Sequence, residues 1–338
     1  MEEALGVGNA APAEAFEPPG LMRNAHVQSV LASSPLRRGV VRRRAESLIR
    51  ASRSVLLDAG RGVRLHGWYT PAGEGASRGL AVLIHGWEGS GGSLYLLTAA
   101  NRLYAEGWSV LRLHLRDHGP SHPLNEEMFH SCRIREVTQA VARAAEVFDA
   151  RPLCLGGFSL GGNFALRVAV RAPAAGIPLA RVMAVCPVLD PHSTLVAMER
   201  GARIYESYFM KKWRRSLILK ACLFPDRYHF GNLRRFHGIR DMTAFFVAGY
   251  TEFPDLDAYL SGYAITGDVL AALAVPSQAV LAEDDPLIPV ADVARLARTD
   301  ALTVRTTPWG GHCGFLSGPF GPSWVDDELA RYFAGAAA

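Results

Sequence analysis

Cysteines are few in this sequence, and no pattern pairs them. Five of the 338 residues are cysteine, they are scattered along the chain, and no C-x-x-C pair is present. An odd number of dispersed cysteines is typical of reduced thiols in a cytoplasmic protein, whereas a disulfide framework needs paired ones. We therefore expect free thiols and a cytoplasmic location.

Long hydrophobic runs are also missing. No stretch reaches the roughly 18 uninterrupted apolar residues that a membrane-spanning helix needs, so we expect no integral membrane segment. Residues 1–20 are acidic and rich in proline and alanine, without the basic start and apolar centre of a secretory signal. We interpret this stretch as a flexible lead-in.

The excess of positive charge over the whole chain is small. The formal net charge is +4, and charged residues make up 20% of the sequence. Nucleic-acid binding calls for a basic patch, so this diffuse excess predicts no nucleic-acid partner. Hydrophobic residues make up 49%, and 338 residues suffice for one large α/β domain with an insertion or for two small domains.

The order of apolar runs indicates alternating strands and helices. Short unbroken runs are typical of strands buried on both faces, and stretches of helical composition separate them, which predicts a doubly wound, mostly parallel sheet. A hairpin with its turn at Gly60 to Gly62 precedes these runs. The predicted strands are residues 80–86, 108–116, 152–158, 180–189, 276–284 and 302–308, and the predicted helices are residues 93–107, 132–149, 160–172, 290–299 and 323–335.

The alternation stops between Asp190 and about Tyr263. Aromatic and basic residues mix there with helical periods, which predicts a helical cap insertion over residues 190–265. The fold core would then consist of residues 21–189 and 266–338. We expect the cap aromatics to line an apolar acyl pocket and the basic run to form a solvated helix face. The aromatics are Tyr205, Tyr208, Phe209, Trp213, Phe224, Phe245 and Phe246, and the basic run is Lys211, Lys212, Arg214 and Arg215.

A serine between glycines is the strongest chemical signal. Gly157-Phe158-Ser159-Leu160-Gly161 is a G-x-S-x-G motif between a predicted strand and a predicted helix. At such a sharp turn the serine hydroxyl projects from the sheet edge, and side chains two residues away would collide with neighbouring backbone. A dinucleotide fingerprint needs a different glycine spacing. The pattern therefore predicts Ser159 as a nucleophile.

A nucleophilic serine needs a histidine base held by a carboxylate. On this fold the acid and then the histidine follow the serine in the chain, each at the end of a strand. His312 lies in a glycine-bounded loop after the last predicted strand, and two adjacent aspartates follow the strand before it. We prefer Asp285, four residues before Pro289, as the acid, and expect Asp284 to serve as a loop or capping group.

The negative oxygen of a tetrahedral intermediate needs backbone N–H donors. We predict the amides of Leu160 and Trp87, one directly after the nucleophile and one in the loop after the first parallel strand. His85 is expected to order that loop. The three histidines of residues 112–123 lack helical ligand spacing and a carboxylate-rich partner, so we expect no metal and no cofactor. They are His114, His118 and His122.

These motifs together resemble the YheT-like branch of the α/β-hydrolases, whose relatives include the abhydrolase-domain proteins 1 and 3. The resemblance covers about residues 20–335 and rests on NAHVQSVL, HGWEGSGGS, GFSLGGN, DDPLIP and GGHCGF. Its most diagnostic part is the N-x-H-x-Q element of Asn24, His26 and Gln28. The resemblance implies an α/β-hydrolase fold and a hydrolase of carboxylic esters with the triad Ser159, Asp285 and His312.

Two departures limit what the resemblance implies. Family members usually read HGLEG, whereas Trp87 replaces the leucine here. The eukaryotic relatives that act on lipids have an N-terminal membrane anchor, and we expect no such anchor in this chain. Phospholipid activity is therefore not carried over.

The leading interpretation is a serine hydrolase that cleaves small-molecule esters through an acyl-Ser159 intermediate. A thioesterase or an amidase would use the same residues. A non-catalytic binding protein on the same fold is an alternative from another class, since a fold does not fix a function. The intact order of serine, aspartate and histidine argues against it, and a haloperoxidase-like activity is a weaker third reading.

Overall fold

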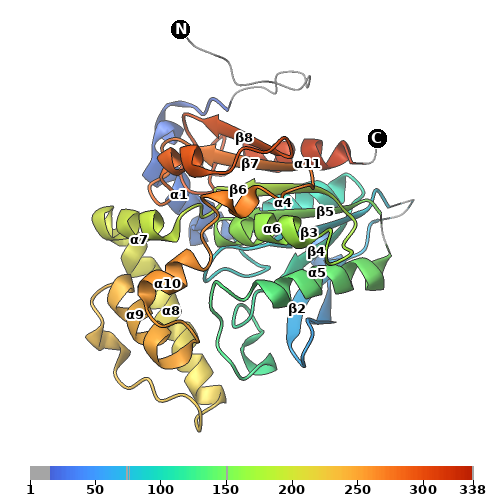
Figure 1. Ribbon diagram of the computed structural model, residues 1–338. Coiled ribbons are helices and arrows are strands. Elements are labelled where there is room, and N and C mark those ends of the chain that lie inside the picture. The colour runs from blue at the N-terminus through green and yellow to red at the C-terminus, as the bar shows by residue number, and fades with distance from the viewer. Residues whose placement is uncertain (1–15, 74, 76, 150, 337–338) are drawn as a thin grey trace.

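Eight strands form one mostly parallel sheet in the computed structural model, which describes residues 16–73, 75, 77–149 and 151–336. Across the sheet the order is β1-β2-β4-β3-β5-β6-β7-β8 (Figure 1). β2 pairs antiparallel with both β1 and β4, and every other pair is parallel. The predicted doubly wound sheet is confirmed. The strands are β1 Arg53–Asp58, β2 Arg64–Thr70, β3 Leu80–Ile84, β4 Ser109–Leu113, β5 Leu153–Phe158, β6 Leu179–Val185, β7 Ser277–Ala282 and β8 Leu302–Thr307.

The parallel strands are buried because helices cover both faces of the sheet. All of β3 is buried, and its side chains alternate between two hydrophobic clusters. Leu80, Val82 and Ile84 pack with side chains of α5 (Ile134–Phe148) and α6 (Leu160–Arg171). Ala81 and Leu83 pack with side chains of α4 (Leu94–Ala105) and α11 (Trp324–Ala334). This two-sided burial explains the unbroken apolar run in the sequence.

The segment at residues 290–299 differs from its prediction as an α-helix. Only a 3₁₀ helix forms there, over Val290–Arg295. The carbonyl of Arg295 accepts a 2.8 Å hydrogen bond from the amide of Gly267, and Leu296 forms a parallel bridge with Gly267. Since this pairing needs extended backbone at Leu296, the helix ends before it.

The chain between β6 and β7 forms four α-helices. They lie together beside the sheet, next to the ends of the parallel strands (Figure 1). Their apolar side chains form a third hydrophobic cluster, which includes Met210, Leu217, Ile239 and Phe246. These helices are α7 Pro191–Arg200, α8 Arg203–Leu223, α9 Ile239–Tyr250 and α10 Leu256–Ser261. Three short helices, α1 Ala25–Ser33, α2 Arg38–Arg44 and α3 Glu46–Ala51, precede the sheet.

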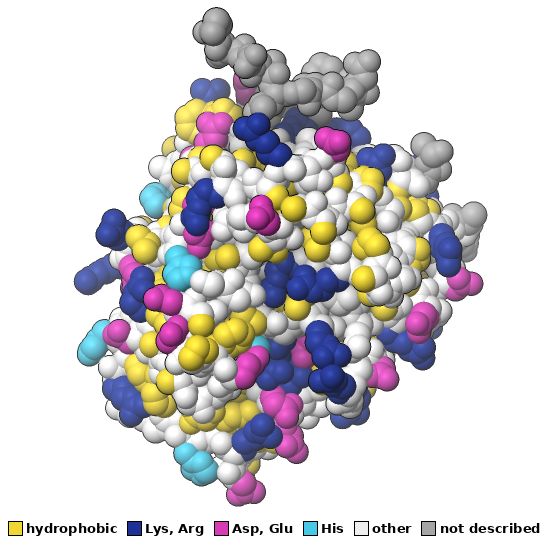
Figure 2. All heavy atoms as spheres, viewed as in Figure 1, with side chains coloured by type: hydrophobic (Ala, Val, Ile, Leu, Met, Phe, Trp, Pro, Cys, Tyr) yellow, Lys and Arg dark blue, Asp and Glu magenta, His cyan; other side chains and the backbone are white. Residues whose placement is uncertain are grey.

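The surface carries charges of both signs. On the face drawn in Figure 2, basic and acidic side chains are interspersed with hydrophobic ones. In the basic run on α8, Lys211 and Arg215 are exposed as expected. Lys212 and Arg214 are half-buried instead, because they donate to backbone carbonyls of Glu88 and of residues 233 and 236. No helix among the described residues combines the length and apolarity needed to cross a membrane.

A buried ion pair joins α8 to the core. The ammonium of Lys220 lies 2.9 Å from a carboxylate oxygen of Asp117, and it also donates to the carbonyls of His122 and Asn125. The side chains of Lys220 and Asp117 are 1% and 8% exposed. Burial lowers the pKa of Lys220 and raises the pKa of Asp117, and each partner opposes the shift of the other. The pair is therefore stable only while both charges remain together.

We expect Lys220→Ala to lower the free energy of unfolding by about 3–5 kcal/mol, because it leaves the carboxylate of Asp117 buried without its cation. Urea denaturation gives this value. The exposed Arg215→Ala on the same helix is the matched control and should stay within about 0.5 kcal/mol of wild type. Equal effects of the two substitutions would contradict a stabilising role for the buried pair.

Candidate active site

Ser159 occupies a strained turn between β5 and α6. Its backbone has φ 55° and ψ −121°, a conformation that non-glycine residues rarely adopt. A Cβ on Gly157 would lie 2.1 Å from the carbonyl oxygen of Gly161, and a Cβ on Gly161 would lie 2.3 Å from the carbonyl oxygen of Ile84. Only glycine fits at both positions. The glycines around the serine therefore allow the turn to pack directly on the end of β3.

Ser159, His312 and Asp285 lie in one hydrogen-bonded chain. Nε2 of His312 is 2.9 Å from Oγ of Ser159, and Nδ1 is 2.9 Å from Oδ2 of Asp285. With the carboxylate ionised, Nδ1 carries the proton and donates it, so Nε2 can accept from the serine hydroxyl. The other oxygen of Asp285 accepts from the amides of Leu287 and Ile288, at 2.8 and 3.1 Å. The acid is thereby held in one orientation.

The electrostatics of this chain favour a basic histidine. The side chain of Asp285 is 1% exposed, and that of His312 is 12% exposed. Burial is the largest influence and opposes a charge on His312, but Asp285 and Cys313 together outweigh it and raise the pKa of His312 well above its ordinary value of 6.5. A buried carboxylate beside an imidazole thus stabilises the imidazolium form.

Asp284 takes a different position. Its Oδ1 accepts a 2.8 Å hydrogen bond from the amide of Gly311, in the loop that carries His312. Burial raises the pKa of Asp284. The neighbouring aspartates therefore have separate surroundings: Asp285 contacts the imidazole, and Asp284 contacts the backbone of the histidine loop.

Helix α1 holds the histidine loop from the other side. Oγ of Ser29 accepts from the amide of His312 at 2.8 Å. The fully buried amide of Gln28 makes two hydrogen bonds to the backbone of Leu316, one as acceptor at 2.7 Å and one as donor at 3.1 Å. From the sequence this segment was predicted only as a family marker, and its contacts with the histidine loop were not predicted. A polar residue whose hydrogen-bond partner lies far away in the sequence leaves no local pattern.

The two other residues of the N-x-H-x-Q element also have defined contacts. The side chain of Asn24 caps α1 by accepting from the amides of His26 and Val27, at 3.0 and 3.1 Å. Nδ1 of His26 lies 2.8 Å from the hydroxyl of Tyr205 on α8. Helix α1 thus touches both the histidine loop and the cap helices.

Buried neutral histidines order the loop that follows β3. His85 donates from Nδ1 to the carbonyl of Gly86 at 2.7 Å, and its Nε2 accepts from the amide of Leu115. Nε2 of His118 accepts from the amide of Glu88, and Nε2 of His114 accepts from an amide later in the same loop. Burial lowers the pKa of His85 and of His114 to about 3. Their ring nitrogens therefore serve as hydrogen-bond acceptors and donors for backbone.

The two predicted oxyanion donors lie beside the serine. Leu160 is the first residue of α6, where free amides and the helix dipole favour negative charge. Trp87 follows Gly86, whose added Cβ would lie 3.1 Å from the Cβ of Ser159. The loop after β3 therefore approaches the serine closely. The indole of Trp87 stacks on Phe209 at 5.3 Å between ring centroids.

A cavity opens next to Ser159 and His312, between the core and the cap helices. Most of its lining is apolar. Of the predicted pocket aromatics, Phe209, Trp213 and Phe246 line it. The other four are not among the lining residues. They were predicted to line it because helical spacing does not say which side of a cap helix faces the core. These four are Tyr205, Tyr208, Phe224 and Phe245.

Comparison with known proteins identifies the family. A family model described as alpha/beta hydrolase fold matches residues 81–319, more than half of the chain. This chain therefore belongs to the α/β-hydrolase fold family. A search of curated proteins found no match.

Several solved structures are similar. An esterase from Pyrococcus furiosus is 15% identical, with a TM-score of 0.59 over 85% of this chain and 91% of that chain. The 2,6-dihydroxy-pseudo-oxynicotine hydrolase is 14% identical, with a TM-score of 0.58 over 92% and 78% of the two chains. Est1E from Butyrivibrio proteoclasticus is 14% identical, with a TM-score of 0.53 over 84% and 98%. At these identities the likeness establishes the fold.

Proposed function

We propose that this protein is a serine hydrolase that cleaves carboxylic esters through an acyl-Ser159 intermediate. The observation that carries the proposal is the hydrogen-bonded chain from Ser159 through His312 to Asp285. This arrangement of nucleophile, base and orienting acid is the one that acyl transfer needs. The apolar cavity beside the serine supports a small-molecule ester as the substrate.

In the proposed mechanism His312 takes the proton of Ser159 as its oxygen attacks the ester carbonyl. Asp285 stabilises the resulting imidazolium and keeps the ring in the productive tautomer. The amides of Leu160 and Trp87 donate to the negative oxygen of the tetrahedral intermediate. His312 then protonates the leaving alcohol, and a water molecule repeats the sequence on the acyl enzyme.

The same residues would support a thioesterase or an amidase, which remain alternatives within this class. A non-catalytic binding protein would not need the strained backbone at Ser159, which persists only where the surrounding structure holds it.

We assign the chain to the YheT-like branch on its N-x-H-x-Q element, with a core of residues 21–189 and 266–338 and a cap of residues 190–265. The five free cysteines support a cytoplasmic location.

Ser159→Ala should abolish ester hydrolysis without unfolding the protein, because the turn needs the glycines more than the hydroxyl. We expect a loss of roughly 10⁴-fold or more in kcat. A fluorophosphonate probe should label wild type and fail to label the variant, which tests the nucleophile before any substrate is identified. Near-normal hydrolysis by a folded Ser159→Ala protein would contradict the mechanism.

Asp285→Asn should slow hydrolysis by roughly 10³–10⁴-fold, and the matched Asp284→Asn should do much less. The wild-type kcat/KM should rise with pH along a limb centred above 6.5, since His312 must lose its proton to act as a base and Asp285 raises its pKa. Asp285→Asn removes that charge, so the limb should move to lower pH. Reversed effects of the two variants would make Asp284 the acid.

Phe209→Ala should change the ratio of kcat/KM between short-chain and long-chain p-nitrophenyl esters by roughly tenfold, because it reshapes the apolar wall of the cavity. Tyr208→Ala is the matched control: Tyr208 precedes Phe209 in the chain, is 42% exposed and does not line the cavity. It should leave the ratio unchanged. A uniform loss across all chain lengths in Phe209→Ala would contradict the cap as the selectivity element.

A further inference from the structure

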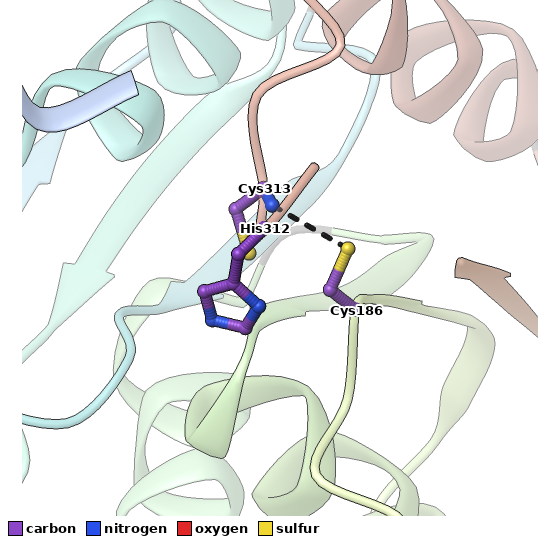
Figure 3. Close-up of side chains that lie close together, drawn as sticks. All are labelled: Cys186, His312 and Cys313. Carbon is purple, nitrogen blue, oxygen red and sulfur yellow. Dashed lines mark hydrogen bonds between the residues drawn. The ribbon is translucent and has the colours of Figure 1, made fainter. Parts of the chain in front are cut away.

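Two free cysteines lie next to His312. Cys313 follows it in the same loop, and Cys186 follows the last residue of β6 (Figure 3). One nitrogen of His312 and the two sulfurs all lie within 4.8 Å of one another. Among the described residues, these three form the group whose donor atoms could hold a metal ion. Neither cysteine has a part in the proposed mechanism.

The surrounding backbone fixes both thiols. The amide of Cys313 donates to the sulfur of Cys186 at 3.4 Å, and the sulfur of Cys186 in turn lies 3.7 Å from the carbonyl oxygen of Gly311. The sulfur of Cys313 lies 3.8 Å from the carbonyl oxygen of Val185. Both cysteines have a left-handed backbone, with φ 43° and 59°. Such conformations persist only where packing determines them, so the backbone that carries both thiols is held in place.

We propose that Cys186, Cys313 and His312 bind a thiophilic divalent cation of the class of Zn²⁺ or Cd²⁺. Two thiolates and an imidazole are ligands that such ions prefer, and three protein ligands leave a fourth position open. With Zn–S near 2.3 Å and Zn–N near 2.0 Å, two sulfurs and one nitrogen in tetrahedral positions lie about 3.5–3.8 Å apart. A separation within 4.8 Å therefore needs inward shifts of about 1.3 Å at most. Each thiol loses its proton to solvent as it binds.

Occupation of this site inhibits the enzyme, a consequence that rests on the proposed function. Both ring nitrogens of His312 already have partners, Asp285 on one side and Ser159 on the other. A cation that takes either nitrogen removes the base from the serine or from its orienting acid. Access is through the cavity, because His312 lines it whereas both cysteines are buried.

Titration of the reduced protein with cadmium chloride tests the site without reference to activity. We expect a saturable ultraviolet thiolate-to-cadmium charge-transfer band that corresponds to one ion per chain, and zinc should reverse it by competition. Cys186→Ala and Cys313→Ala should each weaken binding by roughly tenfold or more, since even outer partners of a metal site are worth that much. Cys222→Ala, which removes an exposed thiol elsewhere, is the matched control and should bind as wild type does.

The band must come from this pair of thiols. No saturable band in wild type, a band that persists in both alanine variants, or a band lost in Cys222→Ala would overturn the site. Circular dichroism shows whether each variant is folded. If one variant does not fold, zinc competition in wild type still tests the site.

Inhibition is measured separately. Cadmium should inhibit ester hydrolysis reversibly, with recovery on addition of EDTA. In each alanine variant, the cadmium concentration that halves the metal-free rate should rise by the same factor as the loss of cadmium binding. A saturated band on a fully active enzyme would overturn His312 as a ligand. If wild type hydrolyses no ester at all, the proposed function fails, and the cadmium band still decides the metal site.

Discussion

The contact between the turn around Ser159 and the end of β3 is the constraint on which the rest of the site depends. The serine can hold its strained backbone only because the turn has no side chain at Gly157 or Gly161, where one would enter neighbouring carbonyls. The same contact brings the loop after β3 against the serine, so the nucleophile and the predicted oxyanion donors are set by one packing arrangement. Loops after β7 and β8 then bring the acid and the histidine to the same edge of the parallel sheet.

Histidine serves two opposite purposes around this edge. His85 and His114 are buried without an acidic partner, so burial lowers the pKa of each to about 3 and they remain neutral supports for backbone. His312 is buried beside the carboxylate of Asp285, which raises its pKa instead. The local charge, and not the residue type, separates a structural histidine from a candidate base.

The sequence was sufficient for the order of strands and helices, because buried parallel strands and amphipathic helices leave local patterns. Glycine spacing, chain order and the distance from Asp285 to Pro289 predicted Ser159, His312 and Asp285 as candidates, and their side chains lie in contact. What could not be predicted depends on contacts between distant segments. Gln28 and Leu316 are hydrogen-bonded across 288 positions, and a lysine in a basic helix gives no sign that it will be buried against an aspartate.

Trp87 links the core to the cap helices. Trp87 packs against the core cluster and also against the cluster of the cap helices, where its indole meets Phe209 and Trp213. The residue whose amide is a predicted oxyanion donor therefore has a side chain held by the walls of the cavity. The packing of the cap aromatics and the position of the loop beside the serine are therefore linked through one side chain.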